Sequence, residues 1–95
     1  TNSPSLAAPA LSLVVPSYNE RANMAPLVDA VAKALGDIAW EIIIVDDDSP
    51  DRTWAEVDRL AAEEPRVRCL RRVGRRGLAS AVIEGAMAAN GRVIA

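Results

Sequence analysis

The sequence predicts an α/β fold in which strands and helices alternate as β-α-β-α-β-α-β around a mainly parallel sheet. Short apolar runs alternate along the chain with segments whose apolar residues recur at helical spacing. The run at 40–45 (WEIIIV) is nearly all apolar without alternation, which is typical of a strand covered by helices on both faces. Such an order predicts parallel strands joined by right-handed crossovers.

The composition is that of a small folded domain and excludes several classes of protein. The 95 residues are 51% apolar and 25% charged, close to ordinary globular usage. No apolar run approaches the roughly 20 residues of a membrane-spanning helix. The absence of His excludes His-based catalysis and His-ligated metal sites within this chain, and the lone Cys69 cannot form an internal disulfide. The net charge of −2 gives no reason to expect nucleic acid as a partner.

Turn and capping residues predict the first strand and helix. Residues 1–10 are small, Pro-containing and aperiodic, and are expected to form a flexible N-terminal segment. The β-prone run 11–15 predicts a strand that Pro16 ends. Asn23 is expected to cap a helix that continues to Gly36.

The later elements follow the same alternation. After the strand at 40–45, Thr53 and Glu56 match a capping box at the start of a second helix, which Pro65 ends. The remaining strand, helix and strand are expected at 67–70, 78–90 and 92–95.

Polar and charged residues gather at one edge of the predicted sheet. In parallel α/β sheets, ligands bind beyond the carboxyl ends of the strands. The residues that follow the first three predicted strands are Pro16–Glu20, Asp46–Asp48 and Arg71–Arg76. The sequence therefore predicts a ligand site at this edge.

Three adjacent carboxylates, Asp46, Asp47 and Asp48, follow the second predicted strand. Because like charges repel, the cluster costs stability unless donors or cations compensate it. Any one of them is equally well explained by an Asx-turn before Ser49 and Pro50, with the others solvated. For the triplet together a functional role is favoured, because carboxylates accept hydrogen bonds from a nucleobase N–H or hold Mg²⁺ or Mn²⁺.

The loop after the first strand carries a second group of candidates. Pro16 stiffens this loop, which is a structural role. Tyr18 is the only Tyr, and its ring offers a stacking surface for a planar base, although loop aromatics also cover core edges. Glu20 could accept a hydrogen bond from a ribose hydroxyl. Alternatively, its negative charge stabilises the positive end of the following helix.

An Arg-rich stretch supplies the third group. Residues 66–76 hold six Arg and no acid. Four of these flank the turn before the third predicted helix: Arg71, Arg72, Arg75 and Arg76. Guanidinium groups there, with the backbone of Gly77, suit a diphosphate. Ordinary surface positions explain at least half of the four equally well.

Three stretches occur together in a characteristic order. They are VPSYNERAN at 15–23, EIIIVDDDSPDRT at 41–53 and GRRGLASA at 74–81. This combination resembles the N-terminal half of the family 2 glycosyltransferases, and within them the dolichyl- and polyprenyl-phosphate mannosyltransferases. The resemblance spans nearly the whole chain after residue 10.

The resemblance implies a GT-A fold, a Rossmann-like nucleotide-binding sheet of which residues 11–95 form the N-terminal part, truncated at the fourth strand. The residues that match the family's nucleotide-sugar site are Pro16, Tyr18, Glu20, Val45, Asp47, Arg75 and Arg76. Pro16, Tyr18 and Glu20 match the loop that holds the nucleoside. Val45 and Asp47 match positions that contact the base and the ribose. Arg75 and Arg76 match basic residues before the helix.

The implied activity is transfer of a hexose, mannose from GDP-mannose, to dolichyl or polyprenyl phosphate by direct displacement at the anomeric carbon. A UDP-sugar enzyme acting on the same kind of lipid, and a nucleotide-binding module without chemistry of its own, are the alternatives. The acceptor implies a cytoplasmic protein, peripheral at or tethered to the cytoplasmic face of a membrane.

The resemblance also implies a divalent cation, Mg²⁺ or Mn²⁺, bound by a D-x-D motif. This motif is expected just after Ala95, so no catalytic residue or metal ligand is assigned within the chain, and the 95-residue polypeptide alone is expected to be inactive. The chain departs from the family at Asp48, Arg52 and Ala79, where the family usually has Gly. Asp48 adds charge beside the base site, and Ala79 removes backbone freedom near the phosphates.

Overall fold

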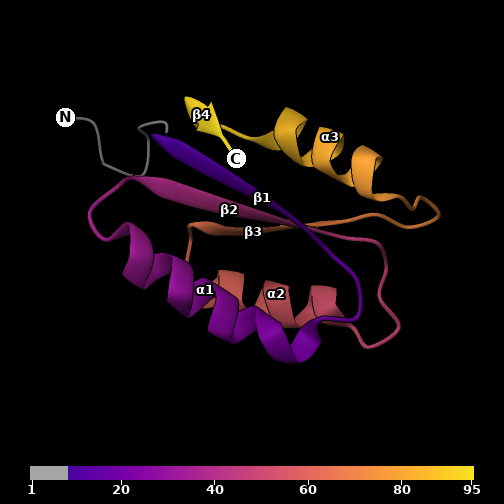
Figure 1. Cartoon of the computed structure of the whole chain (residues 1–95). Helices are drawn as coiled ribbons and strands as arrows, with labels where there is room; N and C mark the ends of the chain where they lie inside the picture. Colours follow the sequence, from indigo (N-terminus) through magenta and orange to yellow (C-terminus); the bar gives the residue numbers. More distant parts are fainter. Residues whose placement is uncertain (1–8) are drawn as a thin grey trace.

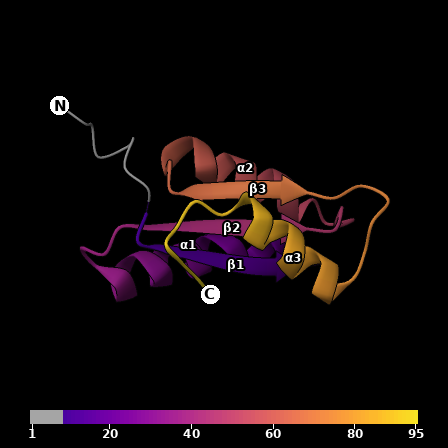
Figure 2. The ribbon, with the colours of Figure 1, turned by 90° about the horizontal axis from the view of Figure 1, so that it is seen from above.

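A four-stranded parallel sheet carries helices on both faces (Figures 1 and 2). The computed structural model describes residues 9–95, so the expected flexible segment at 1–10 falls mostly outside the described residues. The elements are β1 (Leu11–Ser17), α1 (Arg21–Leu35), β2 (Trp40–Asp46), α2 (Thr53–Glu63), β3 (Val67–Arg71), α3 (Leu78–Ala88) and β4 (Val93–Ile94). The predicted order of strands and helices is confirmed.

The central strand β2 is buried on both faces, which explains its unbroken apolar sequence. Ile42 and Ile44 pack in one core with residues of α1 and α2. Ile43 and Val45 pack in a second core with Ala81 of α3. Figure 1 shows α1 and α2 on one side of the sheet and α3 on the other. Alternate residues of β2 therefore serve two separate layers.

The sheet has a switch point beside β1. The strand order is β3-β2-β1-β4, so the chain runs outward from β1 to β3 and then returns to the other side of β1. The crossover that makes this return contains α3. Ligands of open α/β sheets bind at the carboxyl ends of the strands where the order reverses in this way.

Strand β1 continues through Pro16 to Ser17, so the prediction that Pro16 ends it is wrong. Pro16 lies opposite Val45 in the parallel register. The N–H of Val14 donates to the carbonyl of Ala95, on the β4 side of β1. Two residues later the backbone N of Pro16 faces the same side, away from β2, so its missing N–H costs the β1–β2 ladder no bond.

The predicted cap of α1 is also wrong. The helix begins at Arg21, and Asn23 lies inside its first turn. The Asn23 side-chain amide donates to the Glu20 carboxylate at 2.5 Å instead of capping the helix. Gly36 ends the helix as predicted, with a φ of 52° that suits a residue without Cβ.

The capping box of α2 does not form. Thr53 is the first helical residue, and its hydroxyl donates to Asp51 at 2.5 Å. Glu56 instead accepts two hydrogen bonds from Arg59 on the same helix. The N-cap position belongs to Arg52, which has a left-handed backbone with φ of 62°.

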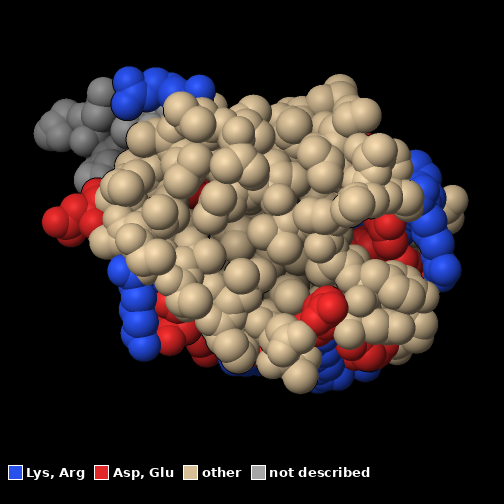
Figure 3. Space-filling model, viewed as in Figure 1, with Lys and Arg blue, Asp and Glu red and all other residues tan. Residues whose placement is uncertain are grey.

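Charged side chains lie mainly around the rim of the molecule in the view of Figure 3, and the surface between them is uncharged. Exposed apolar side chains are found on α3 and β4: Leu78, Val82, Ile83, Met87, Val93 and Ile94. Within residues 9–95, none of the helices combines the length and the apolar character needed to cross a bilayer.

Candidate functional site

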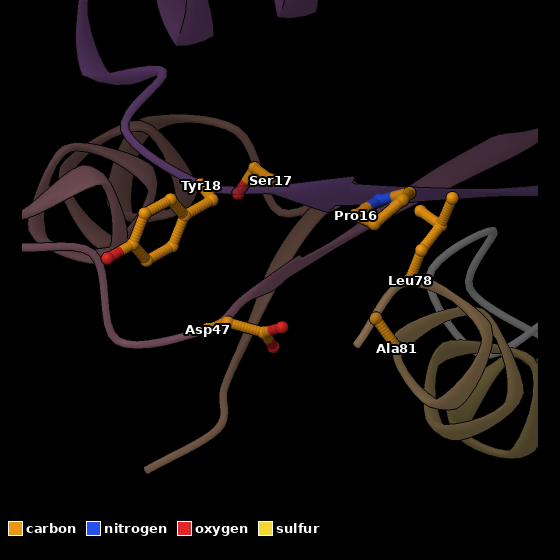
Figure 4. A pocket seen from close by; sticks show the side chains of 6 residues that line it. All are labelled: Pro16, Ser17, Tyr18, Asp47, Leu78 and Ala81. Atoms are coloured by element: carbon orange, nitrogen blue, oxygen red, sulfur yellow. The ribbon is translucent and has the colours of Figure 1, made fainter. Parts of the chain in front are cut away.

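A pocket of about 200 Å³ opens at the carboxyl ends of β1 and β2, against the start of α3. It is lined by Pro16, Ser17, Tyr18, Asp47, Leu78 and Ala81. Figure 4 shows Tyr18 and Asp47 on one side of this pocket and the two α3 residues on the other. The pocket therefore lies at the switch point of the sheet, where the sequence predicts a ligand site.

The first Asp of the triplet has a structural role. Asp46 is fully buried. Its carboxylate accepts hydrogen bonds from the Ser49 N–H at 3.0 Å, the Ser49 hydroxyl at 2.5 Å and the Ser17 hydroxyl at 3.2 Å. Asp46 thus has the structural role that the sequence offered for one member of the triplet, but its backbone bond is to the N–H three residues on, whereas an Asx-turn uses the N–H two residues on.

The second Asp is held as an anion at the pocket wall. Arg72 donates from Nε to Oδ1 of Asp47 at 2.7 Å and from Nη2 to Oδ2 at 2.9 Å. The backbone N–H of Gly77 donates to Oδ2 at 3.2 Å. These hydrogen bonds, that from Arg72 above all, lower the pKa of Asp47 below its ordinary value. Asp47 is therefore ionised over the whole neutral range.

The third Asp is paired separately and is more exposed. Asp48 has a φ of 56°, and its Oδ1 accepts from Nε and Nη2 of Arg71 at 2.9 and 2.6 Å. The Arg71 guanidinium also lies 3.8 Å from the ring centroid of Trp54. Arginines thus relieve the repulsion at Asp47 and Asp48, and serines satisfy Asp46.

The triplet does not fit a divalent cation. Protein donors occupy all three carboxylates, and two of them are in ion pairs with arginines that a cation would have to displace. Among residues 9–95 there is no group of three His, Cys, Asp or Glu residues placed to hold a metal ion.

The basic residues before α3 divide into two roles. Arg76 lies with its guanidinium 5.0 Å from the ring centroid of Tyr18, whose side chain is 40% exposed at the pocket. Arg75 is turned toward α3, where it pairs with Glu84 at 3.0 Å. Of the two predicted basic residues, Arg76 is thus the one beside the pocket.

Two other predicted residues lie away from the pocket lining. Val45 is fully buried in the core under α3. Glu20 is exposed at the start of α1, where its carboxylate accepts from Asn23 and its backbone N–H donates to Thr53. Pro16, Tyr18 and Asp47 are the predicted residues that the pocket brings together.

Arg72 is one of the four arginines that the sequence predicts to suit a diphosphate or to lie at the surface, and in the structure it does neither. It is fully buried, and its Nη1 donates to Ser80 at 2.9 Å and to Glu84 at 2.6 Å. Its hydrogen bonds to Asp47, and after that to Glu84, raise the pKa of Arg72. The place of Arg72 two residues after Leu70, just beyond β3, indicates an inward-facing side chain, but not its pairing with Asp47, which lies 25 residues away in the sequence.

The fold and the pocket together define a class of protein. A parallel α/β sheet with its polar residues at the switch point is the architecture of nucleotide- and cofactor-binding α/β proteins. Residues 12–95 match the family described as glycosyl transferase family 2, and the chain belongs to this family.

Relatives within the family are similar over most of this chain. A dolichol-phosphate mannosyltransferase of Pyrococcus furiosus is 45% identical over 83 residues, which are 87% of this chain and 23% of the relative. A protein of the same name from Saccharomyces cerevisiae is 38% identical over 86 residues, covering 87% of this chain and 32% of the relative.

A solved structure has the same fold. The mannosyltransferase PcManGT from Pyrobaculum calidifontis, in complex with GDP-Man and Mn²⁺, superposes with a TM-score of 0.73 at 26% identity. The match covers 99% of this chain and 28% of that protein. The predicted GT-A type of α/β fold is confirmed, and the chain spans about a quarter to a third of the length of these proteins.

Proposed function

We propose that the natural full-length protein transfers mannose from GDP-mannose to a dolichyl or polyprenyl phosphate, and that this chain supplies its nucleotide-binding part. The observation that carries the proposal is the pocket at the switch point, where an ionised Asp47 lies across from apolar residues of α3 and beside Tyr18. The names of the relatives and the GDP-Man complex of the structural neighbour support mannose as the sugar.

The predicted residues act on different parts of the bound nucleotide in this proposal, and Pro16 forms part of the pocket wall. The Tyr18 ring and the apolar pocket walls receive the base, and Asp47 accepts a hydrogen bond from it. Glu20 takes a ribose hydroxyl, and Val45 places the end of β2 beside the base. Arg76 contacts the diphosphate. Arg75 also contacts it once its ion pair with Glu84 is released.

The sugar leaves the nucleotide when a phosphate oxygen of the lipid bonds to the anomeric carbon. The bond from that carbon to the diphosphate breaks, and GDP departs. Because the structural neighbour binds Mn²⁺, we include Mg²⁺ or Mn²⁺ as a cofactor of the complete protein. Its lipid acceptor would bring the protein to the cytoplasmic face of a membrane.

The test is nucleotide binding by the full-length protein and its Asp47→Ala variant. Removal of the carboxylate deletes one charge-assisted hydrogen bond, so affinity for GDP and for UDP should each fall roughly tenfold or more by calorimetry. Asp29→Ala is the matched control, because Asp29 is an exposed carboxylate paired with Lys33 on α1.

Unchanged affinity of Asp47→Ala for both nucleotides would overturn the contact to the base. Tighter binding of UDP than of GDP would favour a UDP-sugar donor over GDP-mannose. Nucleotide binding without any sugar transfer would favour a module without chemistry.

A further inference from the structure

Arg72 connects the pocket wall to α3 through a single buried guanidinium. One side of this group donates to both oxygens of Asp47, and the other side donates to Ser80 and Glu84. Its Nη2 also donates to the Gly77 carbonyl at 3.1 Å. Because these partners hold the planar group from both sides, the Asp47 carboxylate is fixed in relation to α3.

These donors leave one acceptor position on Asp47. A carboxylate offers about four acceptor positions, two on each oxygen. Oδ2 accepts from Arg72 and from the Gly77 N–H, whereas Oδ1 accepts from Arg72 alone. Asp47 lines the pocket beside Tyr18, so this carboxylate is within reach of a ligand that fills the pocket (Figure 4).

We propose that Arg72 is a positioning residue of the nucleotide site, which holds Asp47 so that its Oδ1 takes one N–H or O–H donor of the bound nucleotide. The inference rests on the proposed function, because that function supplies the ligand. An acceptor that is already fixed loses less conformational freedom on binding. A carboxylate with one free position pairs with one donor, and does not form a two-point contact to the adjacent N–H groups of guanine.

A double-mutant cycle tests whether Arg72 acts through Asp47. Arg72→Lys keeps the positive charge and removes the two-point contact, so the full-length variant should bind GDP roughly tenfold more weakly by calorimetry. In an Asp47→Ala background the same substitution should cause no further loss. Thermal unfolding of each variant is measured alongside, to check that the fold is retained.

The matched control is Arg59→Lys on α2. Arg59 donates to both oxygens of Glu56 at 2.9 and 2.7 Å, which is the same kind of contact on a surface that does not line the pocket. Its substitution should leave GDP affinity unchanged.

A pH profile separates positioning from a loss of packing. The charged groups around Asp47 and its partner are Arg72, Arg76, Asp46, Asp48 and Glu84. Arg72→Gln removes a positive charge beside Asp47, so the carboxyl should take up its proton at higher pH. The pH below which GDP affinity declines should therefore rise in this variant and stay unchanged in Arg59→Gln.

Two results would overturn the inference. The first is that Arg72→Lys binds GDP as tightly as the natural protein. The second is that Arg72→Lys lowers GDP affinity as strongly in the Asp47→Ala background as in the natural protein. Failure of the natural protein to bind GDP or UDP would contradict the proposed function itself, and the inference with it. The unsubstituted protein thus distinguishes the two failures.

Discussion

Arg52 and Asp48 have left-handed backbone conformations, with φ of 62° and 56°. They occupy two of the three positions where the resemblance leads one to expect Gly. A side chain in this region costs roughly 1–2 kcal/mol in steric contact, and Asp tolerates it better than Arg because of its short polar side chain. Ala79 differs from both, since it lies in the first turn of α3 and does not need the freedom of Gly.

Arg52→Gly and Arg52→Ala separate backbone strain from side-chain contact. Both variants lose the stacking of Arg52 on Trp54, at 5.3 Å from the ring centroid. Only Gly relieves the left-handed strain, so we expect Arg52→Gly to be more stable than Arg52→Ala by about 1 kcal/mol. Thermal unfolding of the full-length variants measures the difference. Equal midpoints would show that the strain is absent.

At the residue scale, the sequence predicts that the Asp triplet is functional, but not which role each of its three carboxylates has. A strand pattern would place Asp46 and Asp48 on one side and Asp47 on the other, but β2 ends at Asp46 and Asp48 has a left-handed backbone. The partners that decide their roles come from distant parts of the chain: Ser17 in β1, and Arg71 and Arg72 at the end of β3. Such long-range pairs have no local signal, which is why the importance of Arg72 for Asp47 could not be predicted.

At the element scale, α3 lies close to the sheet because Gly85 faces it. A Cβ at Gly85 would be 3.0 Å from Cγ2 of Val45 and closer still to Cγ1 of Val14. These neighbours belong to β2 and β1, the two strands whose ends form the pocket. The position of Leu78 and Ala81 in the pocket therefore depends on this close approach.

Gly85→Ala should lower stability, although the same change in an exposed helix gains about 1 kcal/mol. Overpacking against the two valines should cost about 1–3 kcal/mol and move α3 away from the sheet. A lower midpoint of thermal unfolding in the full-length variant would support this. Met87→Ala, at an 81% exposed position of the same helix, should change the midpoint little. A higher midpoint for Gly85→Ala would contradict the close packing.

The order of elements could be predicted because each has a local pattern: the apolar run of β2, helical spacing in α1, and Gly36 at its end. The errors concern positions where tertiary contacts override local rules. Pro16 continues β1 because its nitrogen faces away from β2, and the Thr53 hydroxyl donates to Asp51 in place of accepting from a helix N–H. The strand order, which sets the switch point, is itself a long-range property.

At the scale of the whole molecule, the strand order brings the ends of β1 and β2 and the start of α3 to one pocket. The part of the chain that the structure describes forms no cluster of three metal-ligating side chains there. The match to the solved mannosyltransferase, which was determined with GDP-Man and Mn²⁺, covers 28% of that protein.

The most direct measurement is sugar transfer by the full-length protein. Labelled GDP-mannose, a polyprenyl phosphate and Mg²⁺ or Mn²⁺ are incubated with it, and label in the lipid fraction is followed together with released GDP. We expect lipid-linked mannose in amounts equal to the GDP released, reduced roughly tenfold or more by Asp47→Ala and not by Asp29→Ala. Absence of lipid-linked mannose, or transfer that proceeds from a UDP-sugar and not from GDP-mannose, would contradict it.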